Sequence, residues 1–190
     1  MTDGNVGFYD GGTSCSSPGT QIGTAQGLDT NGKASVTTSS LSAGPHTIRA
    51  CYQGTANYAP SSGSLAYAVS YSFGGFLSPL NTDPSVVNMG NAGRTYPIKW
   101  QLKDSSGNYI TTAVTGTTIS VAKLTCSTLS TDLTDPMDYA ADTGGSTLRY
   151  DSTNNQYVYN WATPSTKNAC YRMTVTTPDS QPHFALFQLK

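Results

Sequence analysis

The sequence predicts an all-β fold of the sandwich or barrel type, divided into two parts. Three observations carry this prediction. Helical periodicity is nearly absent, whereas strand-like alternation bounded by Gly, Asn, Asp, Ser and Pro recurs roughly every ten residues. The chain has 190 residues, enough for one large domain or two small ones. A stretch near its middle, Tyr71–Ser85, contains two glycines and two prolines and indicates a connection rather than a strand.

The first half contains five predicted strands. In one of them, His46–Tyr52, the side chains of Ile48, Ala50 and Tyr52 alternate with those of Thr47 and Arg49, so the two sets face opposite sides of a sheet. The five strands are Asn5–Tyr9, Gln21–Ala25, Ala34–Thr38, His46–Tyr52 and Leu65–Tyr71.

The second half contains six predicted strands. In the first of them Ile98, Trp100 and Leu102 share one face, and Pro97 is expected at its start because proline cannot donate to a sheet ladder. The segment Lys103–Asn108 that follows is predicted to form a hairpin turn. The six strands are Tyr96–Lys103, Thr117–Lys123, Thr147–Tyr150, Gln156–Trp161, Cys170–Thr176 and His183–Leu189.

Composition points to an exported protein and excludes some partners. Charged residues make up only 11% of the chain, against about a quarter in an average globular protein. The formal net charge is −1 and no basic cluster is present, so we expect no nucleic-acid partner. No apolar run approaches the ~20 residues of a membrane helix, so no membrane span is expected. The opening residues lack the features of a signal peptide, and we expect the export signal to lie upstream of Met1.

Four cysteines are widely spaced and form no Cys-x-x-Cys motif, which disfavours a zinc ribbon or a thioredoxin-like site. An even number in a chain of exported character predicts two disulfides. Of the three pairings, Cys15–Cys51 with Cys126–Cys170 is the one consistent with two domains. The alternative is four buried free thiols.

Two stretches of the first half resemble the bacterial Ig-like repeat domains of large surface proteins. They are "GNVGFYDGG", Gly4–Gly12, and "GKASVTTSSLSAGPHTIRACYQGTANYAPSSG", Gly32–Gly63. The resemblance implies an immunoglobulin-like sandwich over residues 1–71 whose first two strands would lie before Met1.

Four stretches of the second half resemble the PxKF domain, a module found at the C-terminal end of exported bacterial proteins. The naming motif corresponds to Pro97-Ile98-Lys99-Trp100, with Trp where that family usually has Phe. The resemblance implies a second β-sandwich over residues 72–190 and a place in an architecture rather than a reaction. The stretches are Gly74–Leu80, Asn91–Leu102, Leu148–Trp161 and Cys170–Lys190.

An aromatic row, Tyr157, Tyr159 and Trp161, alternates along one predicted strand. One interpretation is a flat platform that binds sugar rings. The favoured interpretation is the inner face of a sandwich, because aromatic side chains at period two are typical of sheet cores.

An acidic segment, Ser127–Gly145, shows no alternation and is predicted to be a long loop. Its carboxylates could supply oxygen ligands to calcium, although no EF-hand spacing is present. A solvated loop without a metal is the favoured interpretation, and no cofactor is required. The candidate ligands are Asp132, Asp135, Asp138 and Asp142.

Catalysis is disfavoured, and no catalytic residue is assigned. The two histidines, His46 and His183, begin predicted strands, and neither a G-x-S-x-G nor an H-E-x-x-H motif occurs. A Ser–His–Asp grouping around His183 and Asp179 is the arrangement that would revive a hydrolase.

These features together predict two tandem immunoglobulin-like β-sandwich modules with a non-catalytic structural, spacer or adhesion role outside the cell or on its surface. The alternatives are a carbohydrate-binding module and a cryptic hydrolase. A surface glycan or a protein is the expected class of ligand. Without its first strands, the Ig-like half would leave Phe8, Ile48 and Tyr52 facing water. We therefore expect a second copy of the chain, strand exchange or the other half to complete it.

Overall fold

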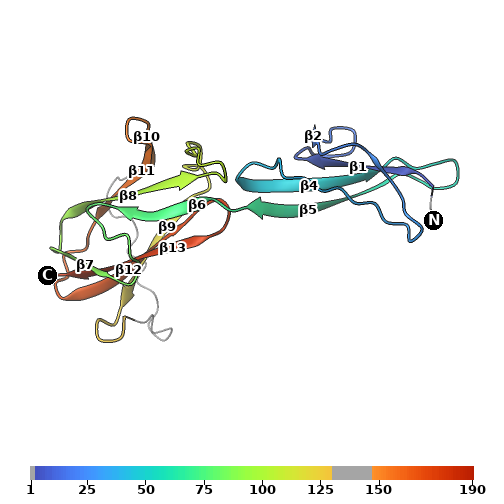
Figure 1. Cartoon of the computed structure of the whole chain (residues 1–190). Helices are drawn as coiled ribbons and strands as arrows, with labels where there is room; N and C mark the ends of the chain where they lie inside the picture. The colour runs from blue at the N-terminus through green and yellow to red at the C-terminus, as the bar shows by residue number, and fades with distance from the viewer. Residues whose placement is uncertain (1–2, 130–146) are drawn as a thin grey trace. The chain divides into compact units, whose positions relative to one another are not determined.

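The computed structural model describes residues 3–129 and 147–190, and every regular element in these ranges is a β-strand (Figure 1). The all-β prediction is therefore confirmed. The chain divides into two compact units, which we call the N-terminal unit (Met1–Val69) and the C-terminal unit (Ser70–Lys190). None of the described residues forms an apolar helix long enough to cross a bilayer.

The N-terminal unit is built on one antiparallel sheet with the order β2-β1-β4-β5, to which β3 adds by pairing with β1. The longest pairing joins β4 and β5 over nine residue pairs without a bulge. Figure 1 shows β1, β4 and β5 running side by side. The strands are β1 (Asn5–Asp10), β2 (Thr20–Gln21), β3 (Gln26–Gly27), β4 (Gly44–Tyr52) and β5 (Ser61–Val69).

One side of this sheet, which we call the apolar face, carries the large hydrophobic side chains. The register places Val6 opposite Tyr52, Phe8 opposite Ala50 and Ile48 opposite Leu65, and paired residues share a face. The residues of the apolar face are Val6, Phe8, Ile48, Ala50, Tyr52, Leu65, Tyr67 and Val69.

Phe8, Ile48 and Tyr52 are half-buried, so the expectation that they face water is wrong. The chain between Leu28 and Ser42 meets this face of the sheet at both of its ends. Leu28 lines a cavity together with Val6 and Tyr52, and the Ser42 carbonyl lies 2.7 Å from Nε2 of His46 on β4.

The predicted strand Ala34–Thr38 does not form; these residues are irregular. A strand exists only as part of a hydrogen-bonded ladder, and no described strand pairs with this segment. Val36 of this segment is nevertheless half-buried and packs closely on Gly23. A Cβ added to Gly23 would lie 3.0 Å from a methyl of Val36.

The C-terminal unit is a sandwich of two four-stranded sheets, ordered β10-β11-β8-β6 and β7-β13-β12-β9. All pairs are antiparallel except β7 with β13. The first sheet contains β6 (Ser72–Leu77), β8 (Thr95–Lys103), β10 (Arg149–Asp151) and β11 (Gln156–Ala162). The second contains β7 (Val87–Gly90), β9 (Thr118–Leu124), β12 (Ala169–Thr176) and β13 (Pro182–Leu189).

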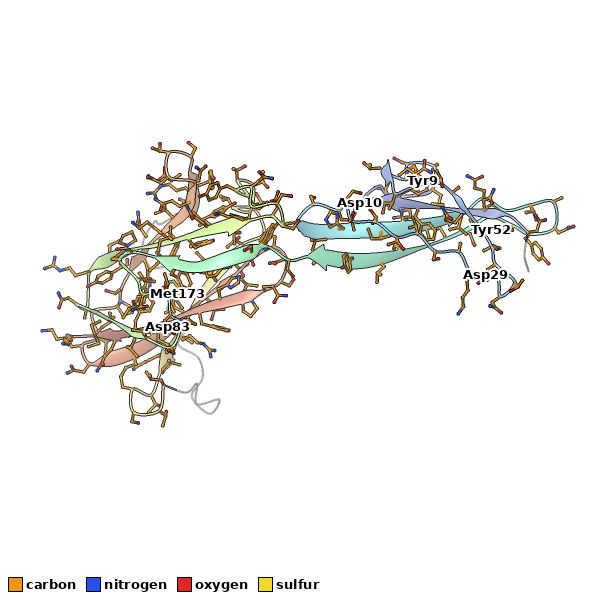
Figure 2. All side chains as sticks on the ribbon, in the orientation of Figure 1. Tyr9, Asp10, Asp29, Tyr52, Asp83 and Met173 are labelled. Carbon is orange, nitrogen blue, oxygen red and sulfur yellow. A yellow bond between two sulfur atoms is a disulfide. The ribbon has the colours of Figure 1, made fainter. Side chains whose placement is uncertain are left out.

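The core of this unit lies between its two sheets. Trp100 is fully buried on β8. Met173, labelled in Figure 2, is fully buried on β12. Trp161 of β11 bridges the sheets, because its ring lies 4.7 Å from that of Phe187 and 6.0 Å from that of Tyr171, both on the opposite sheet. The predicted alternation of buried Ile98, Trp100 and Leu102 in β8 is confirmed.

The segment Tyr71–Ser85 was predicted to be a connection, but it contains β6. The two glycines that suggested a break form a β-bulge instead: the pairing with β8 shifts register between Phe73 and Phe76. Gly75 has φ +97°, a conformation that favours glycine. The bulge returns Phe76 to the core, where it is 2% exposed.

Candidate functional site

Both predicted disulfides are present. Cys15 and Cys51 are joined with a Cα–Cα distance of 5.7 Å, and Cys126 and Cys170 with one of 5.2 Å. Each lies within one unit, which confirms the pairing expected for two domains and excludes the alternative of free thiols. No described cysteine is therefore available as a nucleophile or metal ligand.

The aromatic row is core rather than platform. The exposed fractions of Tyr157, Tyr159 and Trp161 are 0%, 7% and 3%. Sugar rings need an exposed aromatic face to stack on, so the platform interpretation is wrong for these three residues. Tyr157 instead packs against Trp100, with ring centroids 5.7 Å apart.

The hydroxyl of Tyr157 shows why a polar aromatic can occupy this core. It donates to the carbonyl oxygen of Ile110 at 2.6 Å and accepts from the backbone N–H of Ala113 at 3.1 Å. Burial raises the pKa of Tyr157 to about 12, although the Ala113 bond opposes this. The neutral hydroxyl thus fastens the Ile110–Ala113 segment to the sandwich.

The four candidate calcium ligands, Asp132, Asp135, Asp138 and Asp142, lie outside the described residues, so that site stays a prediction. Over residues 3–129 and 147–190, no group of three or more His, Cys, Asp and Glu side chains is placed to hold a metal ion.

The first of two histidine clusters lies in the N-terminal unit. Nδ1 of His46 lies 2.7 Å from Oδ2 of Asp10, which ends β1, and Nε2 lies 2.7 Å from the Ser42 carbonyl. The His46 side chain is 7% exposed. Burial alone would lower the pKa of His46, but the Ser42 bond and the Asp10 carboxylate together raise it. Since both ring nitrogens face acceptors, the imidazolium is favoured and its two N–H groups donate.

The second cluster lies in the turn between β12 and β13. The Thr177 hydroxyl donates to Oδ1 of Asp179 and is 3.5 Å from Nε2 of His183. Oδ2 of Asp179 accepts the backbone N–H of Tyr71 at 2.8 Å. Burial lowers the pKa of His183, and Asp179 only partly offsets this. His183 stacks on Phe73, with ring centroids 3.7 Å apart.

This second cluster contains the residue types of a hydrolase in the wrong order. A catalytic triad needs the imidazole between the hydroxyl and the carboxylate, so that it can take the hydroxyl proton. Here the hydroxyl of Thr177 lies between the other two, and Thr177 is 1% exposed. The Asp179 carboxylate instead ties the Thr177 turn to the residue preceding β6. The geometry makes this a structural latch.

A cavity of about 380 Å³ borders this latch, between β6 and the first half of β13. Its wall is mostly apolar and includes the stacked Phe73 and His183 rings. Among the lining residues only His183 titrates, and its lowered pKa keeps it neutral. The lining residues are Phe73, Gly74, Gly75, Phe76, Thr82, Pro84, Pro182, His183 and Phe184.

The sequence pattern missed Phe73, which lies in the segment assigned to a connection. A usable signal was present: Phe73 and Phe76 are three residues apart around two glycines, a spacing that returns both rings to one side only if a bulge intervenes.

The N-terminal unit has a cavity of about 360 Å³ of its own, lined by Val6, Leu28, Gly32, Tyr52, Tyr58, Ala59 and Ser61.

Comparison with known proteins agrees with part of this picture. Residues 1–70 match the model of the bacterial Ig-like domain (group 3), which confirms the Ig-like resemblance of the N-terminal part. A search of curated proteins found no match.

Solved structures similar to this chain include domains 4 and 5 of the S-layer protein SbsC. That likeness has 10% identity, covers 86% of this chain and 89% of that one, and has a TM-score of 0.33. The SbsC fragment rSbsC(31-844) has 9% identity over 100% of this chain and 28% of that one, with a TM-score of 0.32. Scores this low carry no conclusion about function.

Proposed function

We propose that this chain is a non-catalytic structural module of an exported bacterial protein, acting as a spacer or support for other parts of that protein. The observation that carries the proposal is that the cysteines and both histidines, all of them among the described residues, are engaged by the fold. The described cysteines are crosslinked. His46 is held by Asp10 and Ser42, and His183 is stacked on Phe73.

The extracellular or surface location rests on two independent features. Disulfides persist in oxidising compartments, and each unit contains one. The match of residues 1–70 to a bacterial Ig-like domain favours the same location. Disulfide-crosslinked β-sheet units with few charged residues suit a module that must stay folded outside the cell.

We further propose that residues 72–190 are a PxKF-type domain. The motif Pro97-Ile98-Lys99-Trp100 lies on β8, where Ile98 and Trp100 are fully buried and Lys99 lies on the opposite face. In this arrangement the motif is a core strand of the sandwich. Its Phe-to-Trp change is a change of packing, which leaves a structural role intact.

Three assays on the purified 190-residue chain separate the candidate functions. A spacer should unfold under single-molecule force in discrete steps, bind no glycan on an array and turn over no chromogenic ester or glycoside. Specific glycan binding would favour the carbohydrate-binding alternative. Turnover that disappears in His183→Ala, but not in the exposed control Ser165→Ala, would favour a hydrolase and overturn the proposal.

A further inference from the structure

The free edge of β5 is the least protected strand edge of the described sheets. β5 runs for nine residues, Ser61–Val69, and contains no charged residue and no proline. Its register with β4 is unbroken, and all of its residues except Val69 are exposed. In the described part of the chain no strand pairs with its other side. Such an edge presents unpaired N–H and C=O groups to any further strand.

The other sheet edges carry recognisable protection. In the N-terminal unit, β2 and β3 have two residues each. In the C-terminal unit, β10 has three residues and β7 has four. β6 is interrupted by the bulge between Phe73 and Phe76, and β9 carries the exposed Lys123. Short length, bulges and lysine are the devices that stop edges from pairing, and β5 has none of them.

The side chains of β5 divide cleanly between its two faces. Leu65 and Tyr67 lie on the apolar face and are 63% and 52% exposed. Ser64, Ala66 and Ala68 lie on the opposite face, where small side chains leave the edge sterically open. A strand added to this edge would extend the apolar face and cover Leu65 and Tyr67.

We propose that β5 pairs antiparallel with β5 of a second copy of this chain, about a two-fold axis through Ala66. This register places Leu65 opposite the partner's Tyr67 and Ser64 opposite the partner's Ala68. Aliphatic–aromatic pairs then meet on the apolar face and small pairs on the other, as cross-strand packing favours. Because β5 is uncharged, no like charges are brought together.

The same geometry stops the assembly at two copies. Among the described strands β5 is the one long unprotected edge, and the opposite edge of its sheet consists of the two-residue strands β2 and β3. The pairing is therefore isologous and closed rather than fibre-forming. One strand edge buries area at the low end for specific interfaces, below about 1,200 Å², so we expect a dissociation constant in the micromolar range. This pairing is independent of the role proposed above.

The test is a charge swap at the two-fold axis. Ala66 is exposed on the face opposite the apolar one, so Ala66→Lys and Ala66→Glu should leave the fold intact, which circular dichroism checks. Each variant alone would place like charges opposite each other and weaken the dimer at least about tenfold. Mixing the two variants should restore dimerisation. Ser120→Lys, at an exposed position of the edge strand β9, is the matched control and should dimerise like the unmodified chain.

Sedimentation velocity from about 1 µM to about 500 µM provides the readout, since this range brackets micromolar dissociation. The unmodified chain should shift from monomer to dimer across it. A chain that stays monomeric throughout would overturn the proposal and leave the edge to a strand from another protein. A dimer that Ala66→Lys leaves unchanged would overturn it as well, by placing the contact elsewhere.

Discussion

The two units of this chain share an all-β architecture but are stabilised by different means. Every buried hydrophobic residue among those described belongs to the C-terminal unit, except Ile22 and Cys51. The C-terminal unit closes two sheets around aromatic rings. The N-terminal unit has one sheet and relies on a disulfide, the His46 contacts and the chain between Leu28 and Ser42. Apolar and polar residues alternate equally well in both halves of the sequence. Among the described residues, however, only the C-terminal half forms two sheets that pack against each other.

The largest expected effect is the loss of an aromatic ring from the C-terminal core. Trp100 is fully buried against Tyr157 and Phe76, so Trp100→Ala should reduce the free energy of unfolding of this unit by up to about 5 kcal/mol. Urea denaturation followed by circular dichroism measures this. Tyr58→Ala, which removes a ring that is 40% exposed in the N-terminal unit, should cost no more than about 0.5 kcal/mol. Equal losses would erase the contrast between the units.

The disulfides should matter more to the unit that lacks a core. The bridges span 36 and 44 residues, and loop closure of this length contributes about 4 kcal/mol in the chain-entropy model. We expect Cys15→Ser with Cys51→Ser to unfold the N-terminal unit. The corresponding change at Cys126 and Cys170 should weaken the C-terminal unit but leave it folded. Limited proteolysis with mass mapping distinguishes the units, and a protease-resistant N-terminal unit without its bridge would contradict the account.

The latch at Asp179 should contribute an intermediate amount. Asp179→Ala leaves the Tyr71 N–H without its acceptor in a site that is 3% exposed, whereas the Thr177 hydroxyl can still donate to the Gln181 carbonyl. Unsatisfied buried groups cost about 1–3 kcal/mol. Asp179→Asn keeps one carbonyl acceptor and should cost less. Thermal unfolding of both variants measures the difference, and two variants as stable as the unmodified chain would show that the latch contributes nothing.

The smallest effects should come from the histidines, with opposite signs in the two units. The pKa of His46 is raised, so its contribution is present below its unfolded value of about 6.5 and is lost as pH rises through the folded pKa. The pKa of His183 is lowered, so stability is lost as pH falls from about 6.5 toward the folded pKa.

As pH rises from 5 to 8, we therefore expect the free energy of unfolding of the N-terminal unit to fall because of His46. That of the C-terminal unit should rise because of His183, and each change should be less than about 1 kcal/mol. His46→Gln and His183→Gln should each abolish the trend in its own unit only. Unit-resolved denaturation measures both trends, and a common sign in both units would refute the assignment.

The sequence predicted strands correctly where a segment with alternating apolar and polar residues also has neighbouring strands to pair with. β8 and β11 read correctly because each alternates and lies between two other strands. β7 was missed because it has four residues and pairs in parallel with a strand far along the chain. Ala34–Thr38 alternates but has no described partner. Strand formation is thus a property of pairs, which a single segment cannot reveal.

The features of the candidate site also divide into those that the sequence predicted and those that it did not. The number and spacing of the cysteines and the exported composition predicted two disulfides, and the division into two domains predicted their pairing. The latch was not predicted, because Tyr71, Thr177 and Asp179 meet only when the turn before β13 lies beside the start of β6. The grouping of His183 with Asp179 was anticipated as a hydrolase arrangement, and only the order of the contacts distinguishes that from a structural role.

Hydrogen–deuterium exchange on the intact chain, with and without a reductant, tests most directly whether one unit depends on its core and the other on its crosslink. The account predicts that the amides of β8, β11, β12 and β13 exchange slowest and stay protected after reduction. Those of β1 and β4 should be protected only while Cys15–Cys51 is intact. Equal protection of both units after reduction, or equal loss, would contradict it.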